Sequence, residues 1–112
     1  MTLNPFAETR RLVGNLQEAL ENVTPHQDET SYPIGGEAYN LLGSSGERIV
    51  RIEIHGGTFQ DPYHVDIRAS QSRVLDAARS LFEGRRYGFG NAYLYDEADP
   101  QKDREQLQEA QR

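Results

Sequence analysis

The 112-residue chain has the length of a single domain and can bury a core without disulfides or structural metals. It has no cysteine, which excludes disulfide frameworks, thiolate nucleophiles and cysteine-ligated zinc, and its net charge of −6 argues against nucleic-acid binding by bulk electrostatics. No apolar run approaches the roughly 20 residues of a membrane span, and residues 1–5 do not resemble a signal peptide. We therefore expect a soluble, cytoplasmic protein with no membrane partner.

The first predicted element is an amphipathic helix. Asn4 can cap its first turn, Pro5 fits the first helical position, and Pro25 requires the helix to end near residues 22–23. One face of this helix is apolar and consists of Phe6, Leu12, Val13, Leu16, Ala19, Leu20 and Val23. Residues 24–36 are predicted to form a long loop because proline, glycine and polar residues dominate them.

Three strands are predicted next. Residues 37–42 and 47–55 form a hairpin around the glycine-rich turn 43–46, and a short link, 56–61, leads to a strand over 62–69. The second and third of these strands alternate apolar with charged residues, which is typical of strands with one buried face. We therefore expect an antiparallel meander.

Charge predicts the register of the two alternating strands. Like charges directly opposite each other destabilise an antiparallel pair, whereas opposite charges stabilise it. We therefore expect a register in which Arg51 faces Asp66 or Glu53 faces Arg68. The register expected to be absent pairs His55 with His64, Glu53 with Asp66 and Arg51 with Arg68.

A second amphipathic helix follows the strands. Ser70 is its predicted cap, it runs to about Phe82, and Gly84 ends it in the C′ position. Residues 92–95 are predicted to form a short fourth strand. From residue 99 onward the chain is polar, and we expect a solvated helix or a frayed tail there.

The predicted fold is α+β, with a three- to four-stranded antiparallel meander and two amphipathic helices on one face. Its order is α-β-β-β-α-(β)-α, with a single domain over residues 1–98 and a polar helix or tail over 99–112. The order of residues 4–83 is similar in topology to that of double-stranded RNA-binding domains. With the further strand and helix it is similar to that of small acidic secretion chaperones. Neither family's sequence motifs are present.

Histidine and carboxylate residues on the paired strands indicate a possible metal site. Of the three histidines, His55 and His64 are predicted to lie on one face of adjacent strands, with Glu53 and Asp66 nearby. Imidazole and carboxylate are the ligands of a small N/O metal site. The weak metal candidates are His55, His64 and Asp66, because their spacing matches no ligand motif and a polar outward sheet face commonly contains the same residue types.

Residues 85–95 combine arginines with aromatic residues. Arginine beside aromatic rings provides phosphate contacts and base stacking in nucleic-acid-binding proteins. The alternative is that the rings pack along the sheet edge while the arginines extend into solvent. The candidate binding residues of this segment are Arg85, Arg86, Tyr87, Phe89, Tyr93 and Tyr95.

The sequence favours a non-enzymatic interaction protein that acts through contact with a protein partner or through self-association. It shows no nucleophile elbow and no phosphate-binding glycine pattern, so we predict no catalytic residues and no cofactor. A nucleic-acid-binding module that uses residues 85–95 is the alternative. A metal-binding protein or hydrolytic enzyme centred on His55 and His64 is a third possibility.

Overall fold

The computed structural model describes residues 4–29, 36–57 and 62–111. Within these residues, two helices and six strands follow one another: α1 (Pro5–Leu20), β1 (Thr24–Gln27), β2 (Glu37–Leu42), β3 (Arg48–His55), β4 (His64–Ala69), α2 (Ser72–Phe82), β5 (Asn91–Asp96) and β6 (Glu105–Gln108).

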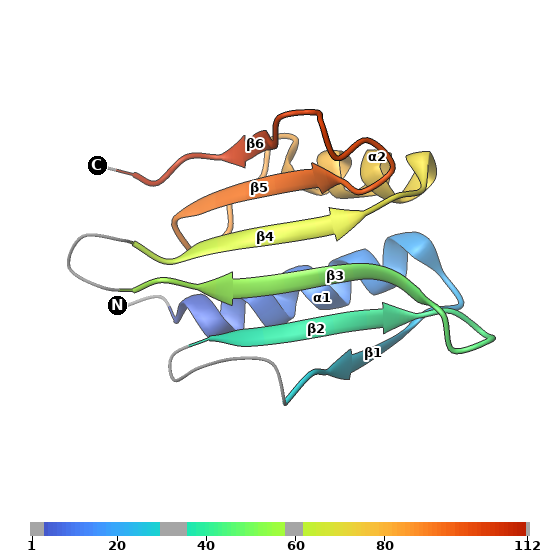
Figure 1. Cartoon of the computed structure of the whole chain (residues 1–112). Coiled ribbons are helices and arrows are strands. Elements are labelled where there is room, and N and C mark those ends of the chain that lie inside the picture. The colour runs from blue at the N-terminus through green and yellow to red at the C-terminus, as the bar shows by residue number, and fades with distance from the viewer. Residues whose placement is uncertain (1–3, 30–35, 58–61, 112) are drawn as a thin grey trace.

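The six strands form one sheet in sequence order, from β1 at one edge to β6 at the other. All neighbours are antiparallel except β4 and β5, which are parallel because α2 carries the chain back between them (Figure 1). The α+β class is confirmed. The prediction of three to four strands in an antiparallel meander undercounts the strands, and the sheet is mixed.

Both helices cover the same face of the sheet, as predicted. Figure 1 shows them behind the strands, with α1 packed against β1, β2 and β3, and α2 packed against β4, β5 and β6. The core between helices and sheet is apolar and includes Leu12, Leu16, Leu41, Val50, Ile52, Ile54, Val65, Ile67, Val74 and Leu94. The other face of the sheet, called the outward face below, is covered by neither helix.

The helix ends follow local capping chemistry. Asn4 Oδ1 accepts hydrogen bonds from the backbone N–H groups of Phe6 (2.9 Å) and Ala7 (3.3 Å), as its position before Pro5 predicts. The predicted cap of the second helix is wrong, because the cap residue is Gln71 and its side chain makes no capping bond. Gly84 takes the left-handed conformation (φ +65°) that a C′ glycine supplies.

Strand β1 lies where a loop was predicted. Its four residues are all exposed, so hydrophobic burial gives no signal for it. It forms because Thr24–Gln27 pair in register with β2, from Thr24 opposite Leu42 to Gln27 opposite Tyr39. Residues 30–35 of the predicted loop and 58–61 of the predicted link lie outside the described residues.

Strand β6 lies where a polar C-terminal helix or tail was predicted. Glu105–Gln108 pair antiparallel with β5, bury Gln108 and pack Leu107 against the core. The element order is therefore α-β-β-β-β-α-β-β, which differs from both topologies that the sequence resembles. Within the described residues, neither helix is long and apolar enough to cross a membrane.

The predicted register of β3 and β4 is wrong. The strands pair His55 with His64, Glu53 with Asp66 and Arg51 with Arg68, so like residues face each other directly. The opposite charges meet diagonally and along one strand instead. Arg68 Nε donates to Glu53 Oε1 (2.8 Å), and Arg51 Nε donates to Glu53 Oε2 (3.0 Å). Long side chains reach diagonal neighbours, so a register with like pairs still neutralises its charges.

Candidate functional site

Residues 85–95 divide between two surfaces. Residues 86–90 line a cavity beside the first turns of α1. Tyr93 and Tyr95 belong to β5, and their register with Asp66 and Arg68 places them on the outward face of the sheet. Arg85 is exposed and does not line the cavity.

Tyr87 and Phe89 are core residues. Their exposed fractions are 2% and 6%, and their rings stack on each other with centroids 5.6 Å apart and planes 2° apart. The Tyr87 hydroxyl accepts a hydrogen bond from Asn15 Nδ2 (2.9 Å), and the Arg11 guanidinium lies over its ring. This burial leaves neither ring free to stack on a nucleic-acid base, which counts against that use of the segment.

The cavity has a volume of about 900 Å³ and is broadly open to solvent. Pockets that bind ligands have volumes of roughly 300–1,000 Å³ and are mostly apolar with a few polar groups. Here the charged groups are Glu8 and Arg86. The lining residues are Pro5, Glu8, Gly57, Pro62, Tyr63, Arg86, Tyr87, Gly88, Phe89, Gly90, Ala110 and Gln111.

Glu8, on α1, connects this helix to the cavity wall formed by residues 86–90. Its carboxylate forms an ion pair with Arg11 Nε (2.9 Å) and accepts a hydrogen bond from the backbone N–H of Gly88 (2.8 Å). The hydrogen bond from Arg11 is the largest of the effects that hold the pKa of Glu8 below its usual value. Glu8 is therefore a fixed carboxylate at neutral pH, and it positions the 86–90 segment.

Arg86 is held at the cavity by backbone groups. Its guanidinium donates to the carbonyl oxygen of Glu109, and its own carbonyl accepts a bond from Arg11 (3.4 Å). Arg86 therefore connects α1 with the chain that follows β6. Its side chain carries positive charge at a wall that is otherwise largely apolar.

Arginines cover the rings of Tyr93 and Tyr95 on the outward face. The Arg104 guanidinium lies 3.7 Å from the centroid of the Tyr93 ring, and that of Arg68 lies 4.2 Å from the Tyr95 ring. Arg104 also donates to the Tyr95 hydroxyl (3.3 Å). These two tyrosines therefore take part in a cation–π arrangement within the chain.

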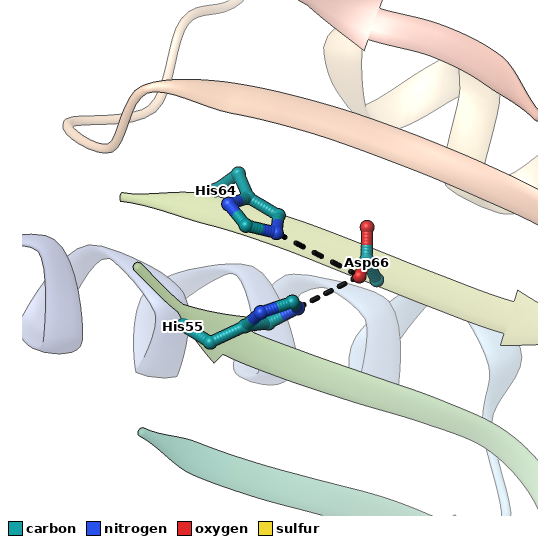
Figure 2. A group of neighbouring side chains, drawn as sticks. All are labelled: His55, His64 and Asp66. Carbon is teal, nitrogen blue, oxygen red and sulfur yellow. Dashed lines mark hydrogen bonds and ion pairs between the residues drawn. The ribbon is translucent and has the colours of Figure 1, made fainter. Parts of the chain in front are cut away.

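The three weak metal candidates meet on the same face. His55 and His64 have ring centroids 3.9 Å apart, and Figure 2 shows both rings directed toward one oxygen of Asp66. His55 Nε2 lies 2.7 Å and His64 Nε2 lies 4.0 Å from Asp66 Oδ2. The register that pairs the two histidines directly is what brings them together.

Two residues of the candidate region were not singled out by the sequence. Glu8 was one of several polar residues on the helix, and no spacing distinguishes it from the others. Gln108 belonged to the segment predicted to be a helix or tail, and it is 7% exposed. Pairing between segments far apart in the sequence gives both residues their roles, so no local pattern could have indicated them.

Comparisons of this chain with protein-family models, with curated proteins and with solved structures found no match.

Proposed function

We propose that this chain is a non-enzymatic interaction protein that binds an apolar segment of a partner protein in the cavity lined by residues 86–90. The observation that carries the proposal is the cavity itself, which combines ligand-pocket size with an apolar wall. Because the cavity is open to solvent, it suits a side chain or short segment that remains attached to a larger partner.

The charged groups of the cavity define the chemistry of that segment. Arg86 presents a guanidinium, and the carboxylate of Glu8 is already engaged by Arg11 and Gly88. The net electrostatic preference is therefore for an acidic group beside the apolar one. An aromatic or aliphatic side chain next to a carboxylate satisfies both features of the wall.

The lining residues support binding more than catalysis. Among the described residues of the cavity wall there is no serine, threonine, cysteine or histidine to act as a nucleophile or general base. The lowered pKa of Glu8 makes this carboxylate a poor proton acceptor near neutral pH.

Site-specific photo-crosslinking tests the proposal. A photoreactive phenylalanine derivative in place of Gln111, which is exposed and lines the cavity, is expected to capture a partner protein from a lysate of the source cells. The matched control is the same group at position 85, which is also exposed but does not line the cavity. Capture at position 111 alone supports the proposal, and equal capture at positions 111 and 85 contradicts it.

A cavity-filling variant distinguishes binding in the cavity from non-specific binding elsewhere on the surface. Ala110 lines the cavity, so Ala110→Trp is expected to abolish crosslinking from position 111. Ser45→Trp, at the exposed tip of the hairpin between β2 and β3, is expected to leave it unchanged. Circular dichroism checks that both variants fold, and mass spectrometry of the product distinguishes a second copy of this chain from a different protein.

A further inference from the structure

The outward face of the sheet contains a group of donor atoms that the proposed function does not use. One nitrogen from each of His55 and His64 and one oxygen of Asp66 all lie within 4.8 Å of one another. Two adjacent strands supply them, with the histidines directly opposite each other and Asp66 two residues after His64. Three donors are thus held together by the backbone register of the sheet.

The donor set fits a borderline divalent metal ion. Zinc is bound by imidazole nitrogen and carboxylate oxygen at about 2.0–2.2 Å, and sites with three protein ligands leave a fourth position open. Calcium and magnesium prefer sites made of oxygen donors alone. Two imidazoles and one carboxylate therefore favour Zn²⁺ over the hard cations.

The two measured distances between donors lie on either side of the value in a tetrahedral site. With zinc bonds of that length, neighbouring donors lie about 3.3 Å apart. The His55–Asp66 distance of 2.7 Å is shorter than this, and the His64–Asp66 distance of 4.0 Å is longer. Zinc binding therefore requires the first separation to widen by about 0.6 Å and the second to narrow by about 0.7 Å, with the ion between the three side chains.

Asp66 gives an independent indication of a missing ligand. Its side chain is 5% exposed, and its Oδ1 atom is buried without a hydrogen-bond partner among the described residues. A buried carboxylate oxygen that accepts no hydrogen bond is costly and uncommon in a folded protein. The two histidines approach the other oxygen, Oδ2, and a cation bound there offsets the negative charge that the buried Oδ1 shares.

The neighbouring arginines make their short contacts with groups other than Asp66. Arg68 approaches Asp66 only to 3.9 Å, because its Nε is bonded to Glu53 at 2.8 Å. Arg51 also bonds Glu53, and Arg104 is held over the ring of Tyr93. The arginines of this face are therefore directed to other groups and do not form a close ion pair with Asp66.

We propose that His55, His64 and Asp66 bind one Zn²⁺ ion on the outward face, with the fourth coordination position open. This site goes beyond the partner-binding cavity and does not depend on it. The ion links β3 to β4 through side chains, in addition to the backbone ladder. It also explains why two histidines and a buried aspartate are paired with like residues across these strands.

Calorimetric titration of the metal-free chain with zinc chloride tests the site. The expected result is one zinc ion per chain, with no binding of magnesium under the same conditions. His64→Gln and Asp66→Asn are expected to weaken zinc binding by about tenfold or more. His26→Gln is the matched control, because His26 lies on strand β1 outside the donor group. The zinc affinity of this variant is expected to equal that of the wild type.

Nuclear magnetic resonance of the imidazole nitrogens gives a readout that does not depend on variants. Zinc is expected to shift the nitrogen signals of His55 and His64 and to leave those of His26 unchanged. The proposal is overturned if the wild type binds no zinc in molar excess, if the two ligand variants bind as tightly as the wild type, or if His26 is the residue that shifts.

Discussion

The side chain of Gln108 pairs with the backbone of Tyr87 as a neighbouring strand would. Its Oε1 accepts from the Tyr87 N–H (2.9 Å), and its Nε2 donates to the Tyr87 carbonyl (3.0 Å). The same Nε2 also lies 2.9 Å from the carbonyl oxygens of Phe89 and Gly90. One buried amide thereby provides hydrogen-bond partners for an irregular segment that pairs with no strand among the described residues.

Truncation of this amide is expected to be costly. Gln108→Ala leaves the buried backbone groups of Tyr87 and Phe89 without partners, so we expect a loss of about 3 kcal/mol in the free energy of unfolding. Urea denaturation measures this loss in the free energy of unfolding. Gln106→Ala, on the same strand but exposed, is the control and is expected to change stability by about 0.5 kcal/mol or less. Similar losses in both variants would show that Gln108 has no special role.

The Glu53 carboxylate is expected to stabilise the β3–β4 register by neutralising the two arginines that face each other. Glu53→Gln removes the charge between Arg51 and Arg68, which face each other directly, and we expect it to cost about 2 kcal/mol. In the Arg68→Met background, Glu53→Gln is expected to lower the free energy of unfolding by about 1 kcal/mol less than it does in the wild type. A double-mutant cycle by urea denaturation measures this coupling, and additive costs would contradict it.

The backbone at the end of α1 is expected to be strained. Glu21 has φ 54° and ψ 154°, a conformation that glycine adopts far more easily than other residues. Glu21→Gly is therefore expected to raise the unfolding free energy by about 1 kcal/mol. Glu18→Gly, in the helix interior, is expected to lower it by about 1 kcal/mol. Thermal denaturation compares the two variants, and a loss in both would exclude strain at Glu21.

The Glu8 carboxylate is expected to make stability depend on acid pH. Its pKa is lowered in the folded state, chiefly by the hydrogen bond from Arg11, so its contribution is present above the ordinary value of 4.5 and is lost as pH falls through the folded value. Glu8→Gln is expected to cost about 1 kcal/mol at neutral pH. That cost should shrink steadily as the pH is lowered below 4.5.

Urea denaturation of the wild type and of Glu8→Gln, from neutral pH to below pH 4.5, measures how the cost of this substitution changes with pH. Glu18→Gln, on an exposed part of the same helix, provides the control and is expected to show no such trend. A cost for Glu8→Gln that stays constant with pH would contradict the role given to this ion pair.

The central part of the fold could be predicted from the sequence because its signals are local. The periodicity of α1, the alternation in β3 and β4, and the glycine turn of the hairpin each specify their element over a few residues. The edge strands gave no such signal. Strand β1 has no buried residue and contains Pro25, and β6 has a single apolar residue, Leu107. Both form because a neighbouring strand offers backbone partners.

The candidate site also combines features that local sequence patterns predict with features that depend on distant contacts. The alternation in β3 and β4 correctly predicted that His55 and His64 share a face. The prediction from charge then failed because it considered only directly opposite residues, whereas Glu53 neutralises its diagonal neighbour Arg68. The burial of Tyr87 depends on contacts with Asn15 and Gln108, which lie far away in the sequence, so composition alone could not separate a binding surface from a core.

The character of the two edge strands limits how this protein can associate. An open sheet edge is a template for further strands, and proteins suppress it with short, polar or proline-containing edges. Strand β1 offers four exposed residues with no N–H donor at Pro25, and β6 is equally short. Growth of the sheet into fibrils is therefore disfavoured at both ends. Association is directed to the surfaces that side chains control, and a high concentration of the protein should remain free of amyloid.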